Sequence, residues 1–463
     1  MLFSSFAYVC CFLPAVVLGF WAVARWGHGQ ARWFLIASSL IFYALGDARA
    51  IPALLLAAVV NCWLGQRIGA ATEPLKVRLL YVALGLNLAQ LLVVKYWAFL
   101  LGAVGVTPPS LHWHVPLGIS FFTLIQMVYL VDCYEGLTVP HPFGHHLLFS
   151  SFFPYVTMGP FVRSRDLPRE LPRPGGLAAD EVARAIELIV IGLFKKAVFA
   201  QSLTALADTG WGMTRPLSPS EAWLTVIAFA LELYFDFSGY SDMAIGSAAL
   251  LGVKLPHNFD APYKATSIIM FWKRWHITLS GFITTYCYTP LVRLRRRPSF
   301  AWAMGATVIS MVIAGLWHGA AWTFVIFGFA HGVALAVNHV WRKAKLPFPA
   351  ALGWLLTFGF VAGTLVLYRA PSLAASGQMF GNLLGSGGRH FDREAFFSNG
   401  LDAARGLAAL AAGVVCITAP TSQSLVAKFG PSYRRVGVFV VLALVAMIFM
   451  NSLTAKAFIY RDF

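Results

Sequence analysis

The feature that most constrains this chain is a succession of apolar segments, most of them long enough to cross, or nearly cross, a lipid bilayer. They recur near 6–24, 33–46, 50–65, 79–101, 115–134, 147–162, 183–200, 222–237, 239–252, 299–317, 320–341, 350–368, 403–419 and 436–453. A hydrocarbon core of about 30 Å requires about 20 apolar residues in a helix. The pattern predicts an all-α polytopic membrane protein with roughly ten to thirteen transmembrane helices.

The composition supports a membrane protein. Hydrophobic residues make up 59% of the chain and charged residues only 12%, which excludes a disordered chain and a soluble enzyme. The net charge of +16 reflects Lys and Arg in cytoplasmic loops and favours contact with anionic lipid headgroups of the bilayer. We therefore expect no nucleic-acid partner.

Several segments are too short to span, and we expect these to form re-entrant or interfacial helices, which are tolerated where protein or a water-filled cavity surrounds the backbone. The first segment lacks a basic region before it and is followed by Arg25 and Arg32. It reads as a retained helix with its N-terminus facing away from the cytoplasm.

Basic loops at 66–78, 163–173, 293–297 and 342–345 are assigned to the cytoplasm. Segment 299–341 has basic clusters at both ends, which predicts a hairpin whose turn, near Gly315–Gly319, lies deep in the membrane. The stretch 371–400 is rich in Gly, Ser and Asn and is expected to form an exposed excursion. We find no internal repeat, which argues against a transporter built from inverted repeats.

Polar residues concentrate between 230 and 332, a region that we take as the catalytic core of a single membrane domain spanning 1–463. They are Glu232, Asp236, Asp242, Lys254, His257, Asn258, Asp260, Lys264, Lys273, Arg274, His276 and His318. Ionisable groups within a membrane are functional candidates. A solvated loop explains 254–264 well, but it explains His276 and His318 poorly.

The stretch 271–280 predicts a short amphipathic helix at the membrane interface. At about 100° per residue, Trp272, Trp275, His276 and Leu279 share one face. The helix is too short to span, so this face is expected to turn into the protein. In the alternative interpretation, the helix is an interfacial anchor whose histidine satisfies a backbone carbonyl.

His318 is a lone imidazole between small residues, with no carboxylate nearby in the sequence. A neutral imidazole is a natural base for a hydroxyl that attacks a thioester. His331 would lie about 20 Å further along a continuous helix and on another face, so the two are not expected to share one site.

Other chemistries lack support in the sequence. It contains no D-x-D, G-x-S-x-G or P-loop pattern and no C-x-x-C pair among its six cysteines. His112 with His114, and His141 with His145 and His146, have spacings that a metal could use, but they have no companion acid. We therefore predict no metal site.

Several motifs, in this order and spacing, resemble the membrane-bound O-acyltransferase family. They are VPLGISFFT at 115–123, FP at 153–154, GP at 159–160, YFDFSGYSDMAIG at 234–246, PHNFDAPY at 256–263, FWKRWHITLS at 271–280 and GLWHG at 315–319. The bacterial branch that O-acetylates alginate and related exopolysaccharides, and that includes the teichoic-acid D-alanylation channel protein, is the most similar.

The resemblance implies a ring of helices around a central channel, with His318 and His276 as the catalytic residues. It places Asp236, Ser238, Tyr240 and Asp242 where they would line or brace the channel. We add Asn258, Trp272, Trp275, Trp317 and Trp322 as further lining residues. Arg293, Arg295, Arg296 and Arg297 could attract the phosphates of a donor; orientation by the positive-inside rule alone also explains them.

The function that this implies is acetyl transfer across the bacterial cytoplasmic membrane, from acetyl-coenzyme A or another acyl thioester, with no bound cofactor. The acceptor is expected to be an exopolysaccharide such as alginate or cellulose, or an extracytoplasmic acetyltransferase partner, in association with a polysaccharide synthase complex. The alternative is a non-catalytic channel or exporter for an acylated lipid or sugar.

Overall fold

The computed structural model describes residues 3–107, 115–168, 170–172, 177–397, 400–428, 430 and 432–452, with the backbone alone for 400–405 and 451–452. These residues form helices and connecting loops without a strand, so the all-α prediction is confirmed. The α-helices are α1 Leu13–Val23, α2 His28–Asp47, α3 Ile51–Ala70, α4 Leu75–Leu91, α5 Trp97–Ala103, α6 Ile119–Tyr134, α7 Phe143–Ser151, α8 Ala179–Phe194, α9 Gln201–Gly212, α10 Pro219–Leu250, α11 Ile268–Trp272, α12 Ile277–Phe282, α13 Thr289–Arg293, α14 Phe300–His318, α15 Trp322–Lys343, α16 Ala350–Arg369, α17 Leu373–Leu383, α18 Arg393–Phe396, α19 Gly400–Thr418, α20 Ser422–Ala427 and α21 Tyr433–Ser452. Wider π-helical turns at Ala7–Phe12, Leu92–Tyr96, Lys195–Ala200 and Ile283–Tyr288, and 3₁₀ turns at Ala48–Ala50, Ser164–Asp166 and Pro262–Lys264, complete the described elements.

Seven helical stretches of the described chain are long and apolar enough to cross a membrane. They are His28–Ala70, Leu75–Ala103, Pro219–Leu250, Phe300–His318, Trp322–Lys343, Ala350–Arg369 and Tyr433–Met450. Three shorter apolar helices accompany them, at Ala7–Val23, Ile119–Tyr134 and Gly406–Thr418. The chain is therefore a multi-pass membrane protein, and the number of its crossings stays a prediction.

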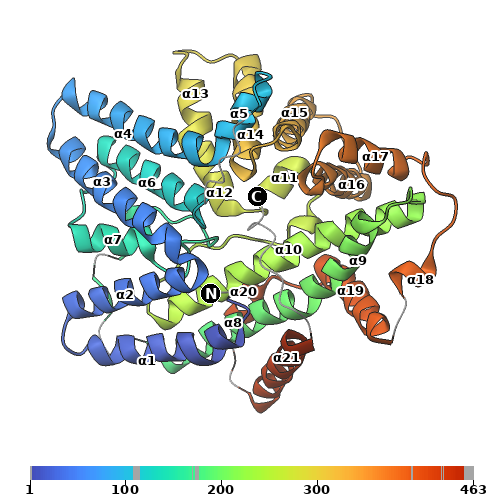
Figure 1. Ribbon diagram of the computed structural model, residues 1–463, viewed down its shortest axis with the longest axis horizontal. Helices are drawn as coiled ribbons and strands as arrows, with labels where there is room; N and C mark the ends of the chain where they lie inside the picture. Colours follow the sequence, from blue (N-terminus) through green and yellow to red (C-terminus); the bar gives the residue numbers. More distant parts are fainter. Residues whose placement is uncertain are drawn as a thin grey trace. The chain divides into compact units, whose positions relative to one another are not determined.

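Two compact units can be distinguished, and we describe each by itself. The first contains residues up to 189 and 241–256. In it, α3, α4 and α6 pack against one another, and α2 packs against α1 and α7 (Figure 1). Tyr8 donates a 2.8 Å hydrogen bond to the hydroxyl of Ser247, which ties the C-terminal part of α10 to the N-terminal helices.

The segment 147–162 in this unit shows how a short apolar run is accommodated. Helix α7 ends at Ser151, and residues 152–162 continue without regular helix although they are buried. The backbone N–H of Phe153 donates to the hydroxyl of Ser39 at 3.1 Å. Such side-chain acceptors are what permit buried irregular backbone.

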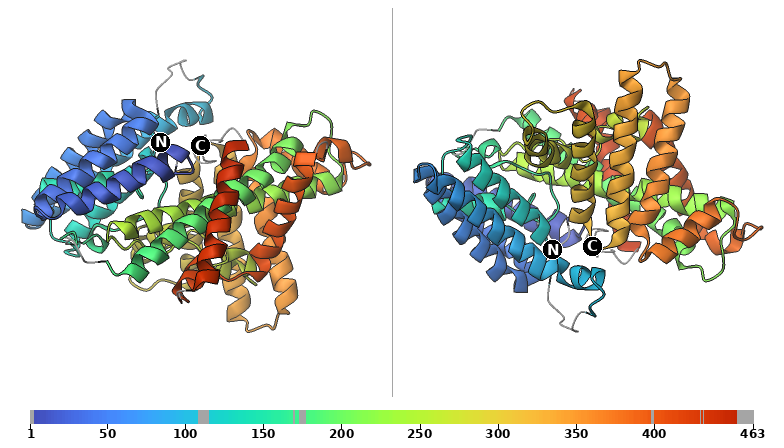
Figure 2. Two further views of the ribbon diagram at one scale, coloured as in Figure 1. Left: turned by 90° about the horizontal axis from the view of Figure 1, so that it is seen from below. Right: turned by 90° about the horizontal axis from the view of Figure 1, so that it is seen from above.

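The second unit contains residues 190–240 and 257–453. Helices α14 and α15 pack along each other as an antiparallel hairpin, and α16 packs on α15 (Figure 2). A Cβ at Gly315 would lie 2.3 Å from the carbonyl oxygen of Phe324, so only glycine permits this approach. The predicted hairpin over 299–341 is confirmed, with its turn at 319–321.

Two boundaries differ from the prediction. The segments 222–237 and 239–252 are one helix, α10, because Gly239 continues the helix and lets the carbonyl of Gly192 approach. The expected excursion 371–400 contains helix α17, whose Met379 and Leu383 are buried. The helix packs against α16, so these apolar positions, rather than the Gly and Ser content, decide the local structure.

Candidate active site

His276 lies at a break between two short helices. Helix α11 ends at Trp272, α12 begins at Ile277, and His276 adopts left-handed backbone angles (φ 42°, ψ 54°). The continuous helix predicted over 271–280 is therefore wrong. The segment 258–260 holds the break, because Ile277 N–H donates to the carbonyl of Asn258 and Asp260 N–H donates to the carbonyl of Arg274, both at 2.9 Å. A strained backbone of this kind persists only where its surroundings fix it, and such sites cluster at functional positions.

The ring of His276 is fully buried among aromatic and polar groups. Its Nδ1 lies 3.0 Å from Oδ1 of Asn258, and its ring and that of Phe237 form a T-shaped pair with 4.7 Å between centroids. Burial, together with the nearby His318, lowers the pKa of the imidazole well below its usual value. His276 is therefore neutral near pH 7.

His318 is the last residue of α14 and is also buried. Its Nδ1 lies 3.2 Å from the hydroxyl of Tyr368 on α16. The ring of Trp317 lies 4.9 Å from that of His318 and 6.4 Å from that of His276, as measured between centroids. The structure thus brings together the two histidines singled out in the sequence, with Trp317 next to both.

His331 has a separate set of partners. The indole N–H of Trp272 donates to its Nδ1 at 3.2 Å, and its Nε2 lies 2.9 Å from the hydroxyl of Thr364. Because the chain turns at 319–321, the predicted separation of about 20 Å along a continuous helix does not apply. What separates His331 from His318 is Phe327, whose ring packs against His331 and Tyr368.

The α10 motif residues are buried inside the protein. Asp236 forms an ion pair with Lys196 in the π-helical turn after α8. Ser238, Tyr240 and Asp242 are also buried. The resemblance implies that these residues either line or brace the channel. The ion pair of Asp236 favours the bracing role for that residue.

The predicted lining tryptophans differ in their surroundings. Trp275 is packed among aromatic rings, including those of Tyr234, Phe259 and Phe271. Trp272 lines a cavity, and Trp317 is buried beside the two histidines. Trp322, at the start of α15, is half exposed.

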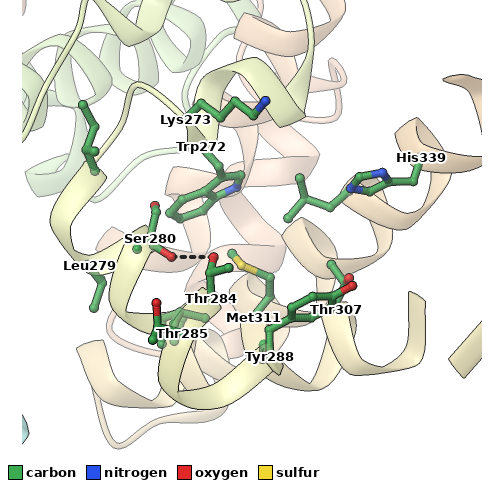
Figure 3. A pocket seen from close by; sticks show the side chains of 16 residues that line it. Trp272, Lys273, Leu279, Ser280, Thr284, Thr285, Tyr288, Thr307, Met311 and His339 are labelled. Carbon is green, nitrogen blue, oxygen red and sulfur yellow. Dashed lines mark hydrogen bonds between the residues drawn. The ribbon is translucent and has the colours of Figure 1, made fainter. Parts of the chain in front are cut away.

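A cavity of about 550 Å³ lies between the α11–α12 region and helices α14 and α15 (Figure 3). Its lining residues are Trp272, Lys273, Ile277, Leu279, Ser280, Gly281, Ile283, Thr284, Thr285, Tyr288, Thr307, Ser310, Met311, Ala314, Leu335 and His339. Figure 3 shows Trp272 reaching toward Ser280 and Thr284, with His339 opposite. Ile277 directly follows His276, and Ala314 lies one helical turn before His318. Neither His276 nor His318 is itself among the lining residues.

The basic run at and after the end of α13 is exposed at all four arginines, Arg293, Arg295, Arg296 and Arg297. The guanidinium of Arg295 lies over the ring of Trp302 at 4.3 Å. The arginines do not line the cavity, and their contact with a donor stays a prediction.

The histidines considered for a metal lie elsewhere. His141, His145 and His146 are buried together in the first unit, with the rings of His141 and His145 4.3 Å apart. His112 and His114 lie outside the described residues. Over the described ranges, no group of three His, Cys, Asp or Glu residues is placed to hold a metal ion.

Sequence reasoning missed three residues of the site region, namely Tyr368, Thr278 and Lys196. Lys196 could have been found, because a lysine inside an apolar segment calls for an acidic partner such as Asp236. Tyr368 lies 50 residues from His318 and has no local signal. Thr278 lies within the quoted motif, but its hydroxyl donates to Oδ1 of Asn258 at 2.9 Å, a contact that only the folded chain creates.

Comparison with known proteins places these observations in a family. A model of the membrane-bound O-acyltransferase family, MBOAT, matches residues 78–377, a range that includes both histidines and the cavity. Similar proteins include a peptidoglycan O-acetyltransferase of Helicobacter pylori, 34% identical over 437 residues (85% of this chain, 82% of that protein), and a probable alginate O-acetylase of Pseudomonas aeruginosa, 34% identical over 395 residues (82% and 74%). A teichoic acid D-alanyltransferase of Bacillus subtilis is 27% identical over 303 residues (59% and 73%).

Proposed function

Because this chain belongs to the membrane-bound O-acyltransferase family and is a multi-pass O-acyltransferase, we propose that it carries acetyl from a cytoplasmic thioester donor to a hydroxyl acceptor beyond a bacterial inner membrane. The observation that carries the proposal is the buried pair of His276 and His318 beside Trp317. Two imidazoles at one point provide a proton acceptor and a polar partner for the thioester carbonyl.

The donor is a substrate, and no bound cofactor is needed. Acetyl-coenzyme A and an acetylated carrier protein share a long, thin thioester arm, which suits a largely apolar cavity whose lining includes Ile277 and Ala314, near the two histidines in the sequence. The exposed run of Arg293, Arg295, Arg296 and Arg297 would attract the donor's phosphates or an acidic carrier. This assigns the cavity and the basic run to the cytoplasmic side.

The acceptor is a polysaccharide hydroxyl, or a serine of an extracytoplasmic acetyltransferase that passes the acetyl group on. Two relatives are named for peptidoglycan and alginate, so the polymer for this chain lies within cell-surface polysaccharides, and a polysaccharide synthase complex would be the natural partner. The expected direction of transfer, from the cytoplasm outward, follows from the location of thioester donors inside the cell.

Thioester cleavage by purified protein tests the activity. The chain in lipid nanodiscs should release free thiol from acetyl-coenzyme A or from acetylated acyl carrier protein, and the release should accelerate when an acceptor polysaccharide is added. Variants with His276→Ala or His318→Ala serve as the negative controls. A wild-type protein that releases no thiol from either donor would leave the exporter interpretation standing.

Sidedness is tested by labelling single cysteines. We expect cysteines placed at Arg295 and Lys343, in a background without the exposed Cys10 and Cys11, to react only after the cells are permeabilised. Reaction of both with an impermeant reagent in intact cells would place the basic run, and the donor entrance, on the wrong side.

A further inference from the structure

We propose that His331 is a positioning residue that holds the indole of Trp272 as a fixed wall of the donor cavity, and so strengthens binding of the donor's thioester arm. This role rests on the acetyl transfer proposed above and deepens it, because it names a residue outside the cavity that determines how well the donor binds. His331 takes part in no chemical step.

Trp272 is the part of this arrangement that a donor would touch. It is the last residue of α11, a helix of only five residues. Its side chain is partly exposed and lines the cavity between the α11–α12 region and helices α14 and α15. Figure 3 shows the indole projecting toward Ser280 and Thr284. An arm that enters the cavity therefore meets this ring, and the orientation of the ring sets the space that the arm can occupy.

The hydrogen bond between Trp272 and His331 allows only one protonation pattern of the imidazole. An indole N–H can only donate, so Nδ1 of His331, at 3.2 Å, must carry the lone pair that accepts it. The proton of the neutral ring is then on Nε2, which lies 2.9 Å from the hydroxyl of Thr364. Thr364 donates its own hydrogen to the carbonyl of Val361 at 2.9 Å. These bonds therefore run in one direction, from α11 through α15 to α16.

The same bonds exclude a second role for His331. Its Nδ1 lone pair is occupied by the indole N–H of Trp272, and its Nε2 carries the proton directed at Thr364. A general base needs a free lone pair that reaches the substrate. His331 has none to offer, so its contribution is to hold Trp272.

The ring of His331 is also rigidly packed. It is 1% exposed, and the rings of Phe327 and Phe360 lie 4.5 Å and 5.0 Å from it between centroids. The indole of Trp272 meets it in a T-shaped pair at 5.3 Å. A side chain that is locked by packing and by bonds at both nitrogens can hold a neighbouring residue that contacts a ligand. His331 thus transmits the rigidity of α15 and α16 to Trp272.

Helix α11 needs such an anchor, because a helix of five residues is not stable by itself. The side chain of Asn338, two turns further along α15, accepts the backbone N–H of Ile269 at 3.4 Å. That contact holds the backbone of α11 but leaves the indole of Trp272 free to turn. Without His331, the indole N–H would have to find another partner, and a turn toward one would change the shape of the cavity.

The test measures donor binding and turnover separately in nanodiscs. The probe is acetyl-pantetheine, which contains the arm shared by acetyl-coenzyme A and an acetylated carrier protein but lacks the nucleotide. His331→Leu removes the acceptor, and KM for the probe should rise roughly threefold to tenfold while kcat stays within about twofold of the wild type. His331→Asn keeps an acceptor oxygen at the position of Nδ1, so it should restore most of the lost affinity. An unchanged KM in His331→Leu would overturn the proposed role.

A double-mutant cycle separates the anchor from general packing. Trp272→Phe has no N–H to hold, so adding His331→Leu to it should leave KM where Trp272→Phe alone puts it. Asn338→Ala is the matched control, because it removes a bond from α15 to the backbone of α11 and leaves the indole held; its KM should equal that of the wild type. If Asn338→Ala raised KM as much as His331→Leu, or if the two changes in the cycle raised KM independently, the effect would belong to helix docking and the indole anchor would be wrong.

A second measurement uses the wild-type chain and does not depend on how well a variant folds. In ¹⁵N-histidine-labelled protein, the His331 signal, identified by its loss in His331→Asn, should show a proton on Nε2 and none on Nδ1. A proton on Nδ1 would contradict the anchor. If the wild type released no thiol from any donor, the acetyl transfer itself would fail. Binding of S-ethyl-pantetheine, a thioether that cannot be cleaved in this way, would then still show whether His331→Leu weakens the hold on the arm.

Discussion

The two histidines of the site are both buried near Trp317 but are held in opposite ways. His276 lies in a break between helices, against an amide oxygen that can only accept. His318 ends a regular helix of 19 residues and faces the hydroxyl of Tyr368, which can either donate or accept. The ground state thus fixes one ring in a single protonation pattern, whereas the other can change its pattern during the reaction.

The largest expected effect is the loss of either ring. His276→Ala and His318→Ala should each lower acetyl transfer on the order of 10²- to 10⁴-fold, because a general base or its charged partner disappears. The loss at His318 should be at the upper end if that ring also positions the thioester. His331→Ala should be milder, because its partners Trp272 and Thr364 lie outside the histidine pair.

Acetyl content of the surface polysaccharide, with membrane levels checked by immunoblot, measures this difference in cells. Wild-type acetylation from a well-expressed His318→Ala protein would refute the mechanism. If His331→Ala lowered the acetyl content as much as His276→Ala, His331 would have to be counted as part of the catalytic site.

The next largest effect concerns how His318 is held. In Gly315→Ala, the new Cβ would meet the carbonyl oxygen of Phe324 at 2.3 Å, so α14 must shift against α15. We expect a destabilisation of about 1–3 kcal/mol and a fall in kcat of roughly tenfold to a hundredfold, since the shift moves His318. Gly305→Ala in the same helix is the control, because a Cβ there meets open space.

Thermal unfolding of both variants in nanodiscs separates packing from chemistry. Should Gly315→Ala and Gly305→Ala have equal activity, the position of His318 would not depend on the close approach of α14 and α15. The regular helix packing would then not be what holds His318, and the comparison with His276 would fail on that point.

The sequence allowed the two histidines and the hairpin to be predicted, for identifiable physical reasons. Ionisable groups are costly in a membrane, so His276 and His318 stood out, and basic residues at both ends of 299–341 required a return path. The break at His276 could not be seen, because helical periodicity reports side-chain direction and says nothing about a left-handed φ. Tyr368 is one hydroxyl in an apolar helix, and only the folded chain brings it to His318.

A smaller effect is expected from Tyr368→Phe, which keeps the ring packed against Phe324 and Phe327 and removes the hydroxyl. One hydrogen bond contributes about 0.5–1.5 kcal/mol, so kcat should fall roughly twofold to tenfold. The nanodisc assay measures it beside His318→Ala. A loss as large as that of His318→Ala would mean that the Tyr368 hydroxyl imposes one protonation pattern on His318, and the two histidines would then be held alike.

The smallest effect is expected in the pH dependence of the wild type. His276 is neutral well below its ordinary pKa of about 6.5, owing to burial and to His318. Lowering the pH through that range therefore does not protonate His276, and the titration of this ring should leave kcat unchanged there. In Asn258→Asp, the added carboxylate stabilises the imidazolium and raises the pKa of His276, so the acid limb of kcat should move to higher pH. The ion pair of Asp260 with Arg274 lies in the same segment. It is present in both the wild type and Asn258→Asp, so a displaced acid limb is attributable to position 258. A wild-type kcat that falls along an ordinary histidine titration, with no displacement in Asn258→Asp, would show that His276 is not the group whose neutral form the reaction needs.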